Sequence, residues 1–382
     1  SGEDTTAILK NFTIQNGRAE GDEGHYFRGG GIIVTSFETP STEAKLENLV
    51  VKNNFGEHGG GIMFWGGEHI IIKNSTISGN FGNNRGGGIL IEGGGTGEIT
   101  NVTITGNTTA GNGAGIRNTE KELNLKNVSI SNNTAGQSGG GIFNQSATLN
   151  IENSTLSGNT ASGAGGGIYA ENSSLIIENS YINNNTSGNQ GGGVYIQDGG
   201  DSRIINSYIE NNTCPGYGGG LTFYRGNLEL IGTVVSSNES TEDYGGGIYV
   251  DGGDVEIIES TLQSNTANGR GGGMFFNGHG YISRSRIVNN VSSGSGGGLV
   301  FVSSTEAEIY NTTVAENSAG NDEGNGIYLG CNGGSVEIKN SILWNSGSEE
   351  LRIEDDCIDE WNVVLEYSTI KGGEEDIVLN GN

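Results

Sequence analysis

Short runs in which every second residue is apolar recur along the chain, and no amphipathic helix can be placed anywhere. The alternation is clear in LNLKN (123–127), LNIEN (149–153) and LIIEN (175–179). A period of two is that of β-strands with one buried face. Because these runs begin at positions 123, 149 and 175, the same strand returns at a nearly constant interval. The pattern predicts an all-β chain built from a repeat.

Two other columns mark each repeat. Asparagine follows an apolar residue by three positions, as in Ile130/Asn133 and Leu156/Asn159. Asparagine tolerates the left-handed backbone region and can bond to the asparagine of the next repeat. Glycine suits sharp turns and close backbone passage. We expect both columns to be structural rather than catalytic. Glycine triplets, two of them imperfect, begin at 29, 59, 86, 113, 139, 165, 191, 218, 245, 271, 296 and 324.

Each repeat contains three expected strands, in the order GGG-I-x-I, x-L-x-I and x-T-I. Three strands and three turns in roughly 26–27 residues make one coil of a right-handed parallel β-helix solenoid. An antiparallel propeller blade needs about 40 residues or more, so it fits less well. We expect about 13 coils, with a repeat array over residues 1–345 and one or more irregular C-terminal coils of the same solenoid over 346–382.

The paired signals GGGI and IxxN resemble the GGA[ILV] and FxxN tetrapeptides of chlamydial polymorphic outer-membrane proteins, with Gly for Ala and Ile for Phe. More broadly, the chain is similar to secreted bacterial and archaeal right-handed β-helix repeat proteins. Its closing segments NSILWN (340–345) and YSTIKGG (367–373) look like the last coils of that group. The resemblance covers nearly the whole chain. It implies that the protein is an adhesin or a component of a surface layer or filament, or, less often in that group, a polysaccharide-active enzyme.

Charge and composition exclude some partners. The 382 residues include 72 Gly and carry a net charge of −27 with only 18 Lys and Arg, which argues against nucleic acid because phosphate binding needs a basic face. No apolar run approaches the roughly 18 residues that span a bilayer, so we expect no membrane insertion. The N-terminal SGED is neither an initiator Met nor a signal peptide, which suggests a mature or trimmed form. A strongly acidic surface suits a secreted, extracellular protein at the cell surface.

The first strand of each repeat carries a column of large side chains. In GGG-I-x-I the residue between the two apolar positions should face outward, and in most repeats it is apolar or aromatic. An exposed stripe of this kind predicts a docking face for another subunit or a covering segment, or else a platform for a glycan. The alternative is that stacked rings only stabilise the sheet. The aromatic members are Phe143, Tyr169, Tyr195, Tyr249, Phe275 and Tyr328.

Two acidic turns are the best candidates for chemistry. The QDGGD turn contains Asp198 and Asp201, and the VDGGD turn contains Asp251 and Asp254. Asp-Gly-Gly is a common tight-turn sequence; a weak Ca²⁺ site shared between the turns is the alternative. The histidines lack metal-ligand spacing, and no nucleophile elbow, Cys–His pair or phosphate loop is found. We expect no other metal and no cofactor, and an enzyme is the less favoured prediction.

Three cysteines leave one unpaired. Cys331 and Cys357 lie one repeat apart, which would place them on neighbouring coils. Strands about 4.8 Å apart fall within the usual Cα range of a disulfide, about 4.4–6.8 Å. We predict this disulfide, with Cys214 free or paired with another molecule.

Asn-X-Ser/Thr sequons are frequent. The repeat contains the sequence N-x-T-I for structural reasons, so sequons arise in it without any selection for glycosylation. Asn107, Asn185, Asn238 and Asn290 belong to the column expected to face inward, where no glycan would fit. The candidate N-glycosylation positions are Asn11, Asn74, Asn101, Asn127, Asn153, Asn172 and Asn311.

These features predict a non-catalytic extracellular β-helix protein, adhesin-like or filament-forming. Its expected partners are copies of itself, joined end to end or laterally, or glycans. A polysaccharide lyase or glycoside hydrolase with a groove lined by acidic turns is one alternative. A carbohydrate-binding module that uses Tyr169, Tyr195 and Tyr249 is another.

Overall fold

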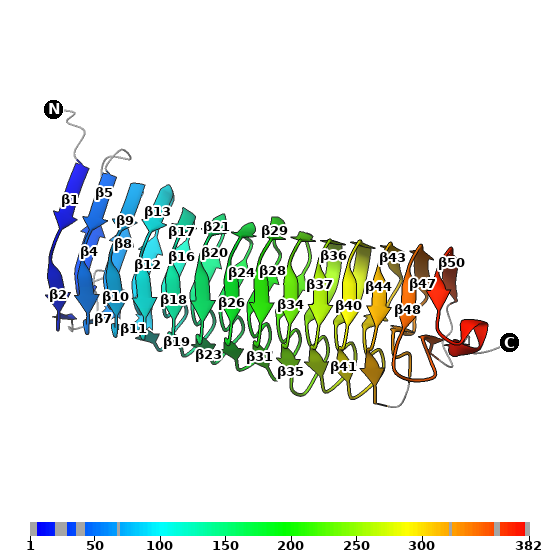
Figure 1. Cartoon of the computed structure of the whole chain (residues 1–382). Helices are drawn as coiled ribbons and strands as arrows, with labels where there is room; N and C mark the ends of the chain where they lie inside the picture. The colour runs from blue at the N-terminus through cyan, green and yellow to red at the C-terminus, as the bar shows by residue number, and fades with distance from the viewer. Residues whose placement is uncertain are drawn as a thin grey trace. The chain divides into compact units, whose positions relative to one another are not determined.

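The computed structural model describes residues 6–19, 29–35, 43–66, 69–320, 323–354 and 360–378. The chain divides into two compact units, residues 1–188 and 189–382, and each is a stack of β-coils (Figure 1). In the described ranges, the only helix is the 3₁₀ turn η1 (Gly373–Asp376). No helix there is long and apolar enough to cross a membrane.

In the first unit the coils build three parallel sheets, and each complete coil gives two strands to the first of them. The strands that follow the glycine triplets are β4 (Ile32–Thr35), β8 (Ile62–Trp65), β12 (Ile89–Glu92), β16 (Ile116–Thr119), β20 (Ile142–Gln145) and β24 (Ile168–Glu171). The strands after the next turn are β1 (Thr6–Lys10), β5 (Glu43–Glu47), β9 (His69–Lys73), β13 (Thr96–Thr100), β17 (Glu122–Lys126), β21 (Leu149–Glu152) and β25 (Leu175–Glu178).

The other two sheets of the first unit take one strand per coil. The second sheet holds β2 (Thr13–Gln15), β6 (Val50–Lys52), β10 (Thr76–Ser78), β14 (Thr103–Thr105), β18 (Ser129–Ser131), β22 (Thr155–Ser157) and β26 (Tyr181–Asn183). The third sheet holds β3 (Arg18–Ala19), β7 (Phe55–His58), β11 (Phe81–Arg85), β15 (Thr108–Thr109), β19 (Thr134–Ala135), β23 (Thr160–Ala161) and β27 (Thr186–Ser187).

The second unit repeats this arrangement, but two of its coils merge the two strands of the first sheet into β36 (Ile248–Ile258) and β39 (Met274–Ser283). The other post-glycine strands are β28 (Val194–Gln197), β32 (Leu221–Tyr224), β42 (Leu299–Phe301) and β46 (Ile327–Leu329), followed by β49 (Leu351–Ile353) and β52 (Ile377–Val378). Their companions are β29 (Asp201–Ile205), β33 (Asn227–Ile231), β43 (Thr305–Tyr310), β47 (Gly334–Lys339) and β50 (Trp361–Glu366).

The second sheet of this unit holds β30 (Tyr208–Glu210), β34 (Val234–Ser236), β37 (Thr261–Gln263), β40 (Arg286–Val288), β44 (Thr313–Ala315), β48 (Ile342–Trp344) and β51 (Thr369–Ile370). The third sheet holds β31 (Thr213–Cys214), β35 (Glu239–Ser240), β38 (Thr266–Ala267), β41 (Val291–Ser292) and β45 (Ser318–Ala319).

The strand register confirms the predicted solenoid. Thr76 pairs with Val50 on one side and with Thr103 on the other, both in parallel, so like positions of successive repeats lie next to one another. The first two predicted strands of each coil belong to one sheet. The two-residue strands of the third sheet, such as Thr134–Ala135, were not predicted, because two residues are too few to show a period.

The asparagine column forms the predicted ladder inside each unit. Each side-chain amide donates to the side-chain oxygen of the next asparagine, at 2.9–3.0 Å in the first unit and 2.8–3.0 Å in the second. The rungs are almost fully buried, so these bonds satisfy polar groups that water cannot reach. The ladders comprise Asn54, Asn80, Asn107, Asn133, Asn159 and Asn185, and Asn212, Asn238, Asn265, Asn290, Asn317 and Asn345.

Both expected reasons for the glycine triplets are present at residues 139–141. Gly139 has φ of 70°, in the region that side chains disfavour. A Cβ on Gly140 would lie 2.4 Å from the carbonyl oxygen of Gly166. The turn therefore requires glycine first for its backbone angle and then for the close passage of the next coil.

Candidate functional site

The two Asp-Gly-Gly-Asp turns lie in the second unit, and all four carboxylates contact a side chain of the following coil. Within the described residues, no group of three or more His, Cys, Asp or Glu side chains could hold a metal ion. This finding gives calcium binding at the two turns no support, and such binding stays a prediction. The contacts are Asp198–Arg225 at 3.1 Å, Asp201–Asn227 at 2.7 Å, Asp251–Asn277 at 2.7 Å and Asp254–His279 at 3.1 Å.

The predicted aromatic stripe lies on the outer side of its strands, but most of it does not face solvent. The exposed fractions are 5% for Phe143, 8% for Tyr195 and Tyr249, 9% for Phe275 and 3% for Tyr328. Tyr169 is half-buried and stacks on Phe143, with ring centres 5.0 Å apart. The expectation of an open aromatic surface is therefore wrong for the five buried residues, while binding by the stripe stays a prediction.

In the second unit, part of the stripe is covered by tyrosines that directly precede two of the glycine triplets. Tyr217 stacks on Tyr249, with ring centres 4.4 Å apart and planes at 15°. Tyr244 stacks on Phe275 at 5.0 Å and 13°. Tyr249 and Phe275 each belong to the coil after the one that their covering tyrosine introduces, so each covering ring lies over the stripe of the next coil.

Three tyrosines form the accessible surface of this aromatic stack: Tyr217, Tyr224 and Tyr244, which we call the tyrosine layer. All three are partly buried and pack against the cluster that contains Tyr249 and Phe275. The rings of Tyr217 and Tyr244 are stacked at 5.8 Å, and the ring of Tyr224 is tilted at 5.9 Å from that of Tyr249. The layer thus presents several ring faces and edges close together.

Hydrogen-bonding groups surround the tyrosine layer. The Tyr224 hydroxyl donates to Oε1 of Gln190 at 2.9 Å, and Tyr217 is hydrogen-bonded to the Asp243 carboxyl. Asp251 lies near enough to Tyr224 and Tyr249 to affect their ionisation. Ring faces and oxygen acceptors therefore share one surface.

The hydroxyls of Tyr217, Tyr224 and Tyr249 stay protonated far above neutral pH. Burial raises the pKa of Tyr224 and Tyr249 well above its ordinary value, and neighbouring tyrosines and Asp251 raise it further. Burial also raises the pKa of Tyr217 and of the Asp243 carboxyl. At neutral pH these phenols are neutral hydrogen-bond donors and acceptors.

Sequence reasoning missed Tyr217 and Tyr244 because it considered only positions inside the expected strands. A signal was present: tyrosine directly precedes the triplet in PGYGGG (215–220) and EDYGGG (242–247). In most other repeats this position holds a smaller or charged residue. A variable residue next to an invariant turn is where a repeat can display a binding group.

A second feature of the second unit is an acidic groove of about 680 Å³ on the outer face of β36, β39, β43 and β47. The Tyr310 hydroxyl donates to Oε2 of Glu337 at 2.5 Å. Hydrogen bonds from Lys339 and Tyr310 lower the pKa of the Glu337 carboxyl. The ionisable residues that line it are Asp254, Glu256, His279, Tyr281, Glu306, Glu308 and Glu337.

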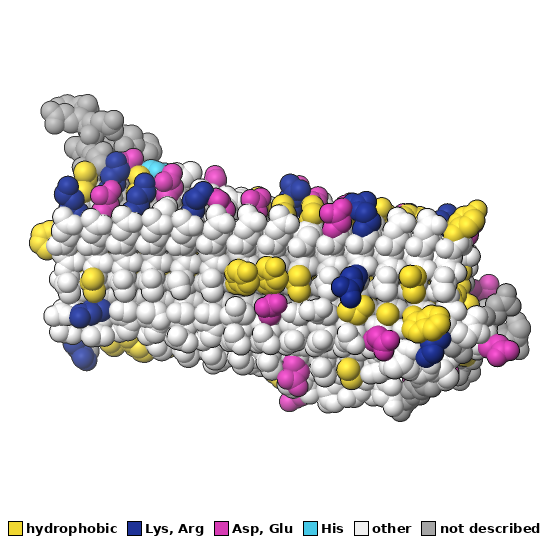
Figure 2. Space-filling view, viewed as in Figure 1, with side chains coloured by type: hydrophobic (Ala, Val, Ile, Leu, Met, Phe, Trp, Pro, Cys, Tyr) yellow, Lys and Arg dark blue, Asp and Glu magenta, His cyan; other side chains and the backbone are white. Residues whose placement is uncertain are grey.

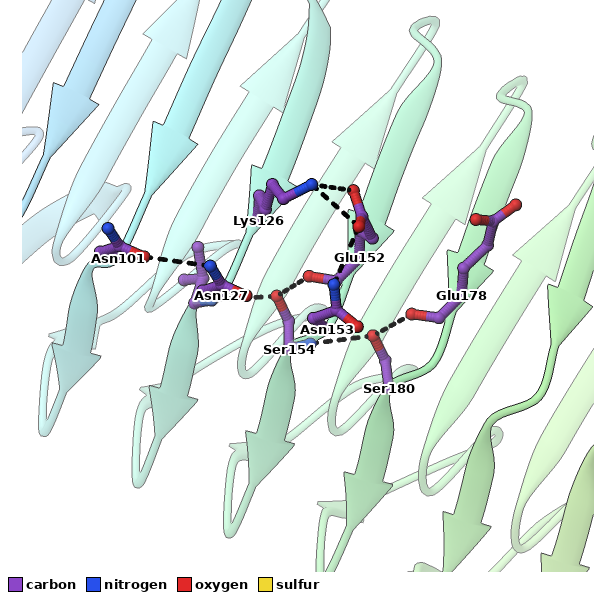
Figure 3. A network of polar contacts seen from close by, with 9 residues as sticks. Asn101, Lys126, Asn127, Glu152, Asn153, Ser154, Glu178 and Ser180 are labelled. Atoms are coloured by element: carbon purple, nitrogen blue, oxygen red, sulfur yellow. Dashed lines mark hydrogen bonds and ion pairs between the residues drawn. The ribbon is translucent and has the colours of Figure 1, made fainter.

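The seven candidate glycosylation asparagines are exposed and have φ between 49° and 64°. Three of them, Asn74, Asn101 and Asn127, form a short outer ladder, in which Asn101 donates to Asn74 at 3.2 Å and Asn127 donates to Asn101 at 3.1 Å. The Lys126–Glu152 ion pair lies beside it (Figure 3). They are accessible, and sugar attachment stays a prediction. The asparagines expected to face inward are confirmed as buried: Asn107, Asn185, Asn238 and Asn290.

Figure 2 shows that, in the first unit, the charged side chains visible on this face gather mainly along its upper edge, whereas in the second unit they also lie scattered below that edge.

Cys214 forms no disulfide within the described residues and is 1% exposed; its pairing with another molecule stays a prediction. Cys331 is disulfide-bonded. Its predicted partner Cys357 lies outside the described residues, so that pairing stays a prediction.

The sequence matches the family described as right-handed β-helix region over residues 60–235 and, overlapping, 143–314. Together these matches cover well over half of the chain. No significant match was found to a curated protein or to a solved structure.

Proposed function

The chain belongs to the right-handed β-helix family, and we propose that it is a non-catalytic, adhesin-like extracellular protein that binds glycans through the tyrosine layer. The observation that carries the proposal is the accessible stack of Tyr217 and Tyr244 over buried aromatic rings. The likeness of the GGGI and IxxN signals to chlamydial polymorphic outer-membrane repeats supports a place at the cell surface.

The chemistry of the layer suits a sugar ring. The C–H face of a pyranose packs on a flat aromatic ring, and its hydroxyls bond to carboxylate and amide groups at the ring edge. Tyr217 and Tyr224 supply ring surface, and Asp243 and Gln190 supply oxygen acceptors. Because buried rings support the layer from beneath, binding requires little ordering of side chains.

The test is binding of the purified full chain to an array of neutral and acidic glycans, followed by calorimetry. We expect Tyr217→Ala and Tyr224→Ala each to weaken binding about tenfold or more. Tyr208→Ala is the matched control, since Tyr208 is an exposed tyrosine of the same unit on a different sheet. Tyr217→Phe keeps the ring and should retain most of the affinity.

Two results would contradict the proposal. One is the absence of any glycan ligand for a protein whose unfolding transition shows it to be folded. The other is equal loss of affinity in Tyr208→Ala and Tyr217→Ala, which would place the contact elsewhere.

The acidic groove favours a second candidate function, cleavage of a polysaccharide. Glu308 and Glu337 pair in register on neighbouring strands, about 4.8 Å apart along the sheet. With this strand spacing the two side chains can bring their carboxyl groups to the separation of about 5–5.5 Å that retaining glycosidases use. The lowered pKa of Glu337 suits the carboxylate that remains ionised in such a pair.

Product release from acidic and neutral polysaccharides, measured with and without a chelator, tests this candidate. Activity that is lost in Glu337→Gln and Glu308→Gln but kept in Glu229→Gln, an exposed ion-paired position on β33, would support an enzyme. Turnover that survives both substitutions would rule out this carboxylate pair.

A further inference from the structure

A groove of about 430 Å³ lies in the first unit, on the outer face of the post-glycine strands. Trp65, Glu92, Thr119 and Gln145 occupy the same position on β8, β12, β16 and β20, where they pair in register. Strands in a sheet are about 4.8 Å apart, so the row extends about 14 Å along the unit. This is room for a ligand that lies across several coils.

Arg117 interrupts the aromatic and aliphatic column at the floor of this groove. Its strand neighbours at the same position are Leu90 and Phe143, and its guanidinium lies 5.3 Å from the centre of the Phe143 ring. The side chain is only 12% exposed. A buried cation in an otherwise apolar column requires anionic or polar partners.

Within the described residues, the partners of Arg117 satisfy it only in part. Nη1 of Arg117 donates to Oε1 of Glu92 at 2.7 Å, and Nη1 of Arg85 donates to the same oxygen at 2.5 Å. The buried Nε of Arg117 has no hydrogen-bond partner there. A buried donor without an acceptor is costly, so the site is incomplete as it stands.

Two guanidinium groups of the groove meet a single, mostly buried carboxylate. Arg85 and Arg117 share the single carboxylate of Glu92, whose side chain is 12% exposed. Glu120 also lines the groove but is exposed at the rim, where water screens its charge. Burial, together with the positive charge of Arg85, lowers the pKa of Arg117 despite the opposing effect of Glu92, as expected for a cation whose charge is incompletely compensated.

We propose that this groove binds the carboxylate of a sugar acid, with the sugar ring against Trp65. A guanidinium is a planar fork that matches a carboxylate in two hydrogen bonds. The indole supplies a flat apolar wall, and Thr119, Gln145 and Ser146 supply hydroxyl and amide groups along the row. This site lies in the first unit and does not rest on the tyrosine layer.

The experiment is calorimetric titration of the full chain with glucuronate and, separately, with glucose, a matched ring without the carboxylate. We expect saturable binding of glucuronate and binding of glucose weaker by about tenfold or more. Tryptophan emission should change on adding glucuronate, and that change should disappear in Trp65→Phe, which keeps Trp344 and Trp361. Raising the salt concentration should weaken binding.

Arg85→Gln is the main variant, since Arg85 is 44% exposed and its loss leaves the Glu92–Arg117 pair in place. It should weaken glucuronate binding about tenfold, and Arg85→Lys should have an intermediate effect because the charge remains. Arg203→Gln is the matched control, as Arg203 is an exposed arginine paired with Glu229. Equal binding of glucose and glucuronate, no binding of either, or equal loss in Arg203→Gln and Arg85→Gln would overturn the proposal.

Discussion

The side-chain amide of Asn345 donates to Oε2 of Glu350 at 2.6 Å, and its backbone N–H donates to Oε1 of the same carboxylate at 2.8 Å. In the preceding coil, Asn317 makes the equivalent two bonds to the side-chain oxygen of Asn345. Glu350 is fully buried. A carboxylate thus takes the place of the next asparagine and receives the last donors of the ladder in the second unit.

The first prediction concerns this cap. Glu350→Ala leaves two buried N–H donors of Asn345 without an acceptor, and each unsatisfied donor costs about 1–3 kcal/mol. We expect the free energy of unfolding to fall by about 2–5 kcal/mol. Glu350→Gln keeps one acceptor oxygen and should cost less. Urea unfolding monitors the change, and Glu360→Ala, at an exposed position, should be nearly neutral. A neutral Glu350→Ala would show that the cap does not stabilise the ladder.

The second prediction concerns a rung inside the first unit. Asn133 donates to Asn159 and to the Ile104 carbonyl, and accepts from Asn107. Asn133→Ala removes these bonds and should lower the free energy of unfolding by about 2–4 kcal/mol. The exposed Gln137 provides the control Gln137→Ala. Similar melting temperatures for both variants would contradict a stabilising ladder.

The third prediction is a loss of stability at alkaline pH. Burial raises the pKa of Tyr328 to about 12, against about 10 in an unfolded chain. Because the folded-state pKa is the higher one, the stabilisation is complete below about pH 10 and is lost as the pH rises towards 12. Ultraviolet titration with parallel unfolding curves should show this, and Tyr328→Phe should reduce the loss by about 2–3 kcal/mol. Unchanged pH dependence in that variant would contradict the assignment.

The fourth prediction concerns Cys214. Burial raises the pKa of its thiol to about 12, and the residue is 1% exposed. A thiol that is neither ionised nor accessible reacts slowly with alkylating reagents. We expect no labelling of Cys214 in the native protein at neutral pH and complete labelling after denaturation, measured by intact mass. Rapid native labelling would mean that the coil around β31 opens.

Part of the candidate site was predictable, and part was not. The outward position of Tyr249 and Phe275 could be predicted, because side chains alternate between inward and outward along the strand that follows each glycine triplet. Their burial did not, because the covering residues Tyr217 and Tyr244 lie in turns, whose conformation has no period. The same holds for Glu350, which reaches the end of the ladder from an irregular segment.

The sequence by itself determined what repeats: the coil length, the strands, the asparagine ladder and the need for glycine at the turns. These follow from the spacing alone, because parallel strands hydrogen-bond only in register and so bring like positions of successive repeats together. Only the tertiary structure decided which side chains cover others, where Arg85 and Arg117 converge on Glu92, and which rings remain accessible. Those contacts depend on the path of each turn, and a turn's path is set by packing against its neighbours rather than by any period in the residues.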